Sequence, residues 1–392
     1  MDTAKSSAWI QGNPRSSKRY SIQVAHERLK RSPDALAALT NVACQAPKTA
    51  TDAAFNVREP TLSNVRFFVK FDDNRDRRGI THAMLCLIEG VGLEEVQRAG
   101  VPSFSARYAT DMSPGLYVRE VAAVARTYGV KSHVLVPPNT SNDAIQELQS
   151  DGIIVTVVED QQKPTSDPTA QALAQTGSYR FPLHNESNSI NGQGTIALEM
   201  ENEVAQLLAT KPSPPSQAPP RLHAILSVMG NASALCGICM ACEGTGTRVF
   251  GAETVADPVH AANGPNFPTI VRGEERYDFD VPMGDVPFST FTTQGLLSAV
   301  LYAEQSIAVR ASEALHQQCG IHVTPRDVAP LAVGLYSEEF HRFLRRNVGR
   351  GQVVNIGVIV QAEQGRLGAH RPATSEFFPG EDLQDGLESL FL

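Results

Sequence analysis

A few residues combine a type and a place in the chain that suit chemistry. Asp111 lies in ATDMSPG (109–115), between a predicted strand end and a predicted helix start, where α/β proteins commonly build a site. Its carboxylate suits general acid/base work, and it also suits a helix N-cap, which the Ser113-Pro114 step favours. His82 is a second candidate for proton transfer, because imidazole titrates near neutral pH. The alternative is a histidine on a helix face that takes no part in chemistry.

Two further segments are candidates for binding a substrate, together with Ser113. His184-Asn185-Glu186 is a polar cluster that also suits an ordinary surface loop. Gly230-Asn231-Ala232-Ser233 is a turn of small residues between a predicted buried strand and a predicted buried helix. Free N–H groups at a helix N-terminus bind anions, so this turn suits a phosphate or a carboxylate.

Three cysteines form CxxCxxC at positions 236, 239 and 242, a pattern that occurs in iron–sulfur and zinc sites. A fourth ligand would have to come from another cysteine or from a histidine. The run lies in a predicted buried helix of small residues, where cysteine packs as a small hydrophobe. We therefore expect no metal site here.

Hydrophobic periodicity assigns the elements that position these residues. A helix is predicted over 117–128, followed by a strand over 133–136, a helix to about Ser150 and a strand over 153–158. The strand, turn, helix and strand from 224 to 253 form a second such unit. Helices and strands that alternate at this spacing predict an α/β fold with a parallel, doubly wound sheet. The remaining predicted elements are helices around 22–39, 194–208 and 306–318 and a buried strand over 353–360.

Composition and charge are those of an ordinary globular protein. The chain has 392 residues, of which 42% are hydrophobic and 19% charged, and its net charge is −8. Nucleic acids and anionic membranes attract basic faces, so we expect neither as a partner. Polar residues and Gly230 interrupt the least polar run, 224–242, which argues against a membrane span. Six cysteines in a chain this long favour a reducing compartment, and we expect a cytoplasmic location.

Several segments, in this order, resemble one enzyme superfamily. ATDMSPGLYVREVAAVARTYGV resembles that family's TDGNHGRGVA helix, and INGQGTIALEMENEV is similar to its "QGT…E" helix. SVMGNASALCGICMA stands where the glycine-rich phosphate loop opens its helix, and TRVFGAET and VVNIGVIVQAEQG resemble later strands. Over about residues 60–365 the chain thus resembles the fold-type-II pyridoxal-phosphate (PLP) enzymes, the tryptophan-synthase-β/threonine-dehydratase superfamily. Within it, the resemblance is to diaminopropionate ammonia-lyase.

The resemblance implies a two-domain α/β fold, a homodimer, and PLP bound as a Schiff base to a lysine. FVKFDDNRDRRGITHAML resembles the stretch through the lysine motif, but it places His82 at the lysine position, or Asp76 if a gap is allowed. Lys70, the only lysine nearby, fits the end of the preceding strand. Met112-Ser113-Pro114-Gly115 stands where relatives have Gly-Asn-His-Gly, whereas Asp111 matches a base of the ammonia-lyases. These departures predict that the Schiff base is lost and that the chain has no cofactor.

The predicted organisation is an N-terminal extension (1–55), a large α/β domain (56–82 and 180–370), a small α/β domain (83–179) and an acidic tail (371–392). We expect a PLP-independent lyase, isomerase or cyclase of specialised metabolism that acts on a small carboxylate-bearing molecule. Asp111 and His82 would move protons in the former cofactor cleft. Two alternatives stay open: a PLP-dependent ammonia-lyase or dehydratase, and a non-catalytic pseudoenzyme that binds a partner or a metabolite.

Overall fold

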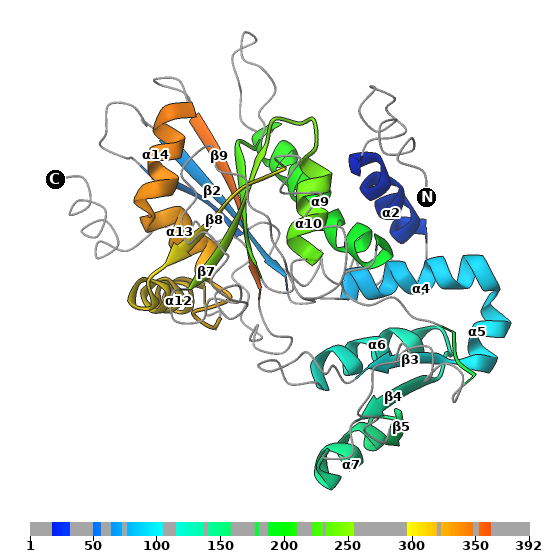
Figure 1. Cartoon of the computed structure of the whole chain (residues 1–392). Coiled ribbons are helices and arrows are strands. Elements are labelled where there is room, and N and C mark those ends of the chain that lie inside the picture. The colour runs from blue at the N-terminus through cyan, green and yellow to red at the C-terminus, as the bar shows by residue number, and fades with distance from the viewer. Residues whose placement is uncertain are drawn as a thin grey trace, which may run out of the picture.

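The protein is seen in a computed structural model. The structure describes residues 18–31, 50–55, 64–72, 77–104, 115–136, 140–157, 177–179, 187–209, 222–229, 233–254, 296–319, 323–347 and 353–361. These residues form a larger and a smaller α/β unit, each built around its own sheet (Figure 1).

A six-stranded sheet with the order β1-β2-β9-β6-β7-β8 is the centre of the larger unit. The β1–β2 pair is antiparallel and the other pairs are parallel. The carboxyl ends of β2 and of the four strands beyond it therefore lie at the same edge of the sheet. The strands are β1 (Ala50–Phe55), β2 (Asn64–Asp72), β6 (Ala224–Val228), β7 (Arg248–Thr254), β8 (Leu297–Ala303) and β9 (Val353–Gln361).

Alternation along β2 separates two hydrophobic cores. Odd-numbered residues from Val65 to Phe71 belong to one core, and Phe68 belongs to the other. Successive side chains of a strand point to opposite faces, so Lys70 and Asp72 share the face of Phe68. Two ionisable residues are thus directed into a helix layer rather than into solvent.

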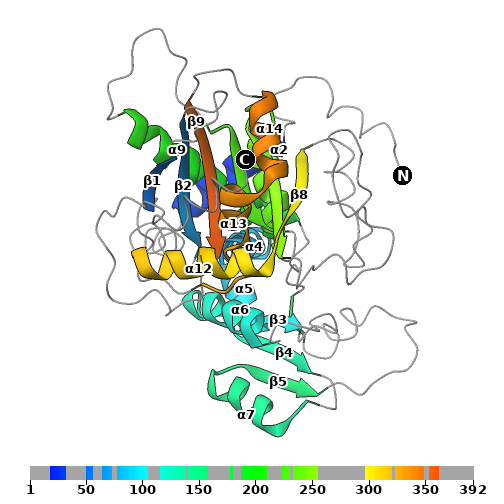
Figure 2. The ribbon, with the colours of Figure 1, turned by 90° about the vertical axis from the view of Figure 1, so that its left-hand side faces the viewer.

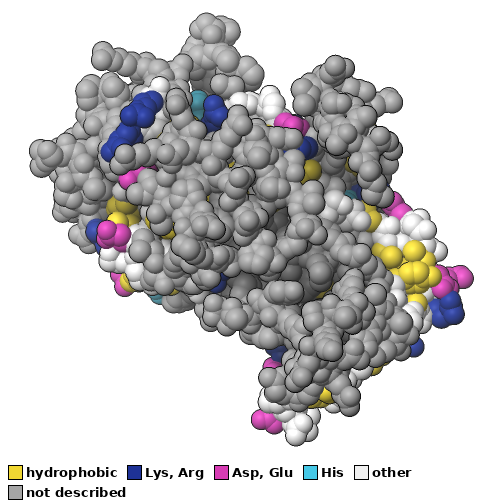
Figure 3. All heavy atoms as spheres, viewed as in Figure 1, with side chains coloured by type: hydrophobic (Ala, Val, Ile, Leu, Met, Phe, Trp, Pro, Cys, Tyr) yellow, Lys and Arg dark blue, Asp and Glu magenta, His cyan; other side chains and the backbone are white. Residues whose placement is uncertain are grey.

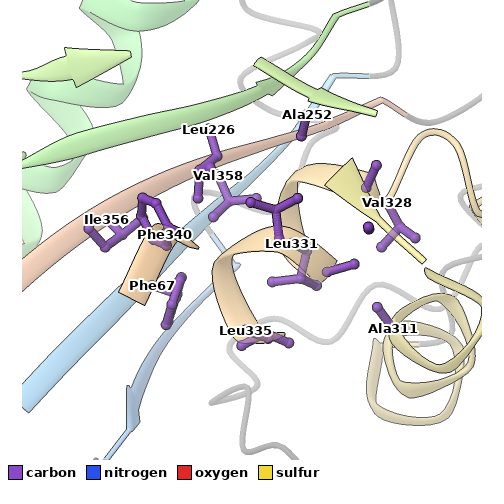
Figure 4. Packing of buried hydrophobic residues seen from close by; sticks show 14 of the residues in the cluster. Phe67, Leu226, Ala252, Ala311, Val328, Leu331, Leu335, Phe340, Ile356 and Val358 are labelled. Carbon is purple, nitrogen blue, oxygen red and sulfur yellow. The ribbon is translucent and has the colours of Figure 1, made fainter. Parts of the chain in front are cut away.

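The first core lies under α12 (Gln305–Cys319), α13 (Ala329–Tyr336) and α14 (Glu338–Asn347). Every residue of α13 is buried. Figure 4 shows Leu331 and Leu335 of α13 beside side chains of the sheet and of the neighbouring helices. Burying one such side chain contributes about 1.5–3 kcal/mol, so this layer is a principal source of stability.

The second core lies under α2 (Lys18–Arg31), α9 (Ser187–Ala209) and α10 (Ser233–Cys242), on the other side of the sheet (Figure 1). Helix α2 is part of the predicted N-terminal extension, yet Ile22, Ala25 and Leu29 are fully buried. This helix therefore packs as a component of the larger unit.

Helix α9 crosses its neighbours at glycines. A Cβ atom on Gly237 of α10 would lie 2.4 Å from the carbonyl oxygen of Ile190 and 2.5 Å from the nitrogen of Gly194. A Cβ atom on Gly192 would lie 2.9 Å from the Cα atom of Gly79 in α4 (Arg77–Val91). Real Cβ atoms do not come this close, so both contacts need glycine.

A three-stranded parallel sheet, β3-β4-β5, forms the smaller unit, which lies beneath the larger one in both ribbon views (Figures 1 and 2). Its core includes Val118 and Ala122 of α6 and Val134 of β4. The elements are β3 (Val101–Phe104), β4 (Ser132–Val136), β5 (Ile154–Val157), α6 (Gly115–Thr127) and α7 (Asn142–Ser150).

Helix α4 joins the two units. It packs on α9 at Gly79, and its Ile80 and Met84 share a core with α6. Helix α5 (Leu93–Ala99) follows at a corner where Val91 and Leu93 are exposed. Figure 3 shows hydrophobic side chains at this corner, on the right-hand side of the molecule.

The predicted elements agree well with the observed ones where the structure describes them. The four predicted elements over 117–158 and the three over 224–253 are confirmed to within about two residues. The largest differences are at α2, which begins at Lys18, and at α9, which begins at Ser187 rather than at Gly194. The predicted α/β class is confirmed, and the domain limits stay a prediction.

Candidate functional site

Several of the predicted site residues fall in the chain at strand-to-helix connections. Asp111 and Ser113 fall between β3 and α6, and Gly230-Asn231-Ala232 falls between β6 and α10. These residues, and His184-Asn185-Glu186 directly before α9, lie outside the described residues. Ser233 is the first residue of α10. Connections of this kind lie at the carboxyl edge of a parallel sheet, where α/β proteins bind ligands.

His82 is the predicted site residue whose side chain the structure describes. It is buried in the second turn of α4, where its Nδ1 atom lies 2.8 Å from the carbonyl oxygen of Asn188 in the first turn of α9. Its Nε2 atom lies 3.1 Å from the guanidinium of Arg28 in α2. Burial lowers the pKa of His82, and the positive charge of Arg28 lowers it further. Both ring nitrogens thus have partners within the protein. A role of His82 in proton transfer stays a prediction.

Arg28 makes contacts along one side of α4. Its Nε and Nη2 atoms lie 3.0 and 2.9 Å from the two carboxylate oxygens of Glu89, and Nη1 lies 3.4 Å from the Cys86 sulfur. Burial raises the pKa of the Cys86 thiol, and Arg28 opposes this shift. A thiol with a raised pKa is a weak nucleophile at neutral pH. The cluster of His82, Cys86, Arg28 and Glu89 is therefore suited to holding helices together.

A groove of about 660 Å³ lies between α2 and α4, beside this cluster. It gives Arg28 and Glu89 access to solvent. The residues that line it are Tyr20, Gln23, Val24, Glu27, Arg28, Leu85 and Glu89.

A second group of ionised side chains is buried between β2, α4 and α9. The Nζ atom of Lys70 lies 2.7 Å from a Glu203 oxygen and 3.3 Å from a Glu199 oxygen. Arg78 bridges Asp72, at 2.8 Å, and Glu199, at 2.9 Å. The side chains of Lys70 and Arg78 are each 3% exposed, whereas that of Glu203 is 25% exposed, so both cations are buried and the network reaches solvent at Glu203.

The network keeps Glu199 and Arg78 charged despite their burial. Burial alone would raise the pKa of Glu199, but Arg78 and Lys70 outweigh it and hold that pKa below its ordinary value. Burial would lower the pKa of Arg78, but Glu199 and Asp72 raise it instead. Each charge therefore depends on the others, and removing one would leave a buried charge uncompensated.

This network was not predicted from the sequence, although a signal for it was present. Gly192, Thr195, Glu199 and Glu203 recur at helical spacing, so they share one face of α9. Carboxylates on the same face as a glycine and a buried threonine indicate a face covered by another element. A buried carboxylate requires a cation, and Lys70 and Arg78 provide it.

The CxxCxxC cysteines lie in the core. Cys236, Cys239 and Cys242 are buried in α10 and pack with α9 and the sheet. Burial raises the pKa of all three thiols. Within the residues that the structure describes, no group of three or more His, Cys, Asp or Glu side chains is arranged to hold a metal ion. None of the described helices combines the length and apolar character that a membrane crossing requires.

Comparison with known proteins identifies the family. The sequence profile of the family described as "Pyridoxal-phosphate dependent enzyme" matches residues 62–344. This match covers more than half of the chain, and the chain therefore belongs to this family of pyridoxal-phosphate-dependent enzymes. A search of curated protein sequences finds no match.

Solved structures of fold-type-II PLP enzymes share the fold. Serine racemase from Dictyostelium discoideum has a TM-score of 0.56 and 18% identity, over 89% of this chain and 98% of that one. Threonine deaminase isoform 2 from Solanum lycopersicum has 0.54 and 15%, over 97% and 94%. Diaminopropionate ammonia lyase from Escherichia coli has 0.50 and 12%, over 90% and 89%. The predicted resemblance and the predicted fold class are thus confirmed.

The expectation that the chain has no cofactor is wrong. Membership of a PLP-dependent family, together with the PLP-enzyme structures that share the fold, indicates PLP as the cofactor. The expectation rested on the departures around His82 and Met112, and such local differences do not outweigh a match over residues 62–344.

The described lysines do not fit the covalent bond to this cofactor. A Schiff base forms on a free amine, whereas the Nζ atom of Lys70 is buried and paired with the carboxylates of Glu199 and Glu203. Lys18 and Lys30 lie near the two ends of α2, and Lys131 is exposed before β4. Among the residues that the structure describes, no lysine is therefore placed as a Schiff-base former.

Proposed function

We propose that the protein is an enzyme that moves a proton on a small carboxylate-bearing metabolite, in an elimination, an isomerisation or a cyclisation. Family membership over residues 62–344 is the observation that carries this proposal. The structural relatives named above are a racemase, a deaminase and an ammonia lyase, that is, isomerases and lyases. The reaction of this chain would belong to the same two classes.

The proposed active site lies at the carboxyl edges of the two sheets. Asp111 would be the general acid/base, since it falls between β3 and α6 and has the functional group that the reaction needs. The turn from Gly230 to Ser233 would bind a carboxylate or phosphate with its N–H groups, because it leads from the inner strand β6 into α10. Ser113 and His184-Asn185-Glu186 would add polar contacts to the substrate.

The test is an activity screen of the purified full chain, supplied with PLP. Serine, threonine and 2,3-diaminopropionate would be the first substrates, with ammonia, 2-oxo acid and the ratio of enantiomers as readouts. Asp111→Asn should lower turnover by roughly 10²–10⁴-fold, as expected for a positioned acid/base. Asp143→Asn, at an exposed position in the first turn of α7, is the matched control and should keep full activity.

Two outcomes would contradict parts of this proposal. A fully active Asp111→Asn protein would remove Asp111 from the mechanism, because asparagine caps a helix about as well as aspartate. An absence of turnover with every substrate, together with tight binding of one of them, would favour the non-catalytic alternative. The basic N-terminal extension and the acidic, aromatic tail are the sequence features that favour that alternative.

The oligomeric state of the active enzyme is part of the proposal. We infer a homodimer, as the resemblance to the family implies. Light scattering coupled to size-exclusion chromatography tests it directly, and a mass of 42.3 kDa, that of one chain, would contradict it.

A further inference from the structure

We propose that Arg28 of α2 is a positioning residue for His82. Together with the Asn188 carbonyl, it holds the ring in one neutral tautomer. These contacts of His82 with Arg28 and Asn188, here called the latch, join α2 to α4 and α9. The proposal rests on hydrogen-bond geometry and not on the proposed activity, so a failed activity screen leaves it standing.

The tautomer follows from what each partner can donate. A carbonyl oxygen only accepts, so the 2.8 Å contact with Asn188 requires a proton on Nδ1 of His82. A guanidinium only donates, so the 3.1 Å contact with Arg28 requires a bare Nε2. The neutral Nδ1–H tautomer satisfies both contacts. The Nε2–H tautomer would lose both, and the imidazolium would lose the contact with Arg28.

Arg28 is itself fixed in place, which lets it select the tautomer. Glu89 accepts from its Nε and Nη2 atoms at 3.0 and 2.9 Å, a two-point contact that orients the planar guanidinium. The remaining nitrogen, Nη1, is thereby directed at His82 and at the Cys86 sulfur. Helix α2 is thus joined to α4 through Glu89 and to the start of α9 through the His82 ring.

The charges around His82 make this latch sensitive to acid. Arg28 faces the ring from α2, Glu89 and the neutral Cys86 thiol lie on α4, and α9 contributes the Asn188 carbonyl. A proton on Nε2 would lie against the positive charge of Arg28, so the two groups would separate. The groove between α2 and α4 is lined by Arg28 and Glu89, the two charged residues nearest the ring.

The pH range follows from the direction of the shift. The pKa of His82 is lowered in the folded protein, chiefly by burial. The unfolded chain binds this proton from about pH 6.5 downward, whereas the folded protein resists it. The latch is therefore complete above about pH 6.5. It weakens as the pH falls toward the lowered pKa.

Nitrogen NMR of the full chain with ¹⁵N-labelled histidine tests the tautomer directly. At pH 7.5 His82 should show a protonated Nδ1 and a bare Nε2, and its signals would be assigned by their loss in His82→Gln. An Nε2–H tautomer, or an imidazolium at this pH, would overturn the proposal. This measurement uses the unaltered protein, so it does not depend on whether any variant folds.

Variants of Arg28 then test the latch. Arg28→Met keeps the aliphatic stem but removes the charge and the donors, so the pKa of His82 should rise toward its ordinary value. Arg28→Lys keeps a cation and should retain most of the lowering, which a merely space-filling role would not predict. Arg98→Met is the control, because Arg98 is 74% exposed and pairs with Glu95. An unchanged titration of His82 in Arg28→Met would refute the role of Arg28.

Discussion

Replacing Lys70 with methionine is the most direct test of the buried ion network. Methionine is similar in length and has no charge, so the substitution removes the cation that pairs with Glu199 and Glu203. With an effective dielectric constant near 20, contacts of 2.7 and 3.3 Å correspond to attractions of about 6 and 5 kcal/mol. Desolvation of the charges cancels much of this. Removing one partner of a buried pair typically costs about 3–5 kcal/mol, and we expect a loss in that range.

The chain contains a matched control for this substitution. Lys30 pairs with Glu27 at 3.3 Å, the same separation as Lys70 and Glu199, but its side chain is 45% exposed rather than 3%. In water the attraction at this distance is about 1 kcal/mol. Screening by salt and the side-chain entropy lost on pairing offset most of it. Lys30→Met should therefore change the free energy of unfolding by less than about 0.5 kcal/mol.

Urea unfolding followed by circular dichroism measures both variants. With a slope of about 3 kcal/mol per M, Lys70→Met should lower the midpoint by about 1–1.7 M, whereas Lys30→Met should leave it unchanged. Equal midpoints for the two variants would refute the argument that burial gives the Lys70 pairs their strength. A pyridoxyl group fixed on Lys70 by borohydride, in protein loaded with PLP, would contradict its assignment as an ion-pairing residue.

Three further outcomes follow from the packing. Gly237→Ala should destabilise the protein by about 1–3 kcal/mol, because the new methyl group would overlap the α9 backbone. The control Gly90→Ala, in α4 with open space around it, should be neutral or slightly stabilising. Thermal unfolding measures both variants, and a reversal of this order would contradict the packing argument. Iodoacetamide labelling of the native protein, read by mass spectrometry, should modify Cys86 while the three buried cysteines of α10 react only in urea, and their early reaction would show that α10 opens. Burial lowers the pKa of His26, so the contribution of His26 to stability should be complete above about pH 6.5 and decrease below it. His26→Gln should therefore make the urea midpoint less dependent on pH between about 5 and 7. An unchanged pH dependence would exclude His26 as its cause.

Much of the fold could be predicted from local patterns, because those patterns have local causes. Apolar runs and their spacing placed β4, α7, β5 and β6 to within one or two residues. Helix α7 begins at an N-cap of the usual type, since the Ser141 hydroxyl accepts from the Ala144 N–H group. Such signals lie within a few residues of the element that they specify, so a reading of the sequence alone detects them.

The starts of α2 and α9 could not be predicted in this way, because distant residues determine them. The Glu243 carboxylate accepts from the N–H groups of Lys18, at 2.6 Å, and Arg19, at 3.4 Å. It thereby caps α2 from 225 residues away. The first turns of α9 contain Ser, Asn and Gly, which disfavour a helix, and the close crossings at Gly192 and Gly194 compensate for them.

The site was harder to predict than the fold for the same reason. His82 could be selected by its residue type and by its place in the family resemblance. Its partners Arg28 and Asn188 are 54 and 106 residues away, so neither its tautomer nor its burial follows from the local sequence. The cofactor expectation failed because it weighed a few positions more heavily than the match over residues 62–344.

The glycine crossing of α4 and α9 has a mechanical consequence. The α4 and α9 backbones approach closely at Gly79 and Gly192, and the side chains of Ser189 and Gln193 pack against this point. The opposite side of α4 carries Ile80 and Met84 into the core of the smaller unit. Helix α4 therefore connects the two sheets and packs closely against both units. A rotation of the smaller sheet relative to the larger one would rotate α4 or bend the chain on either side of it. Because His82 is on α4, a rotation of this helix would also strain the hydrogen bonds of His82 with Arg28 and Asn188.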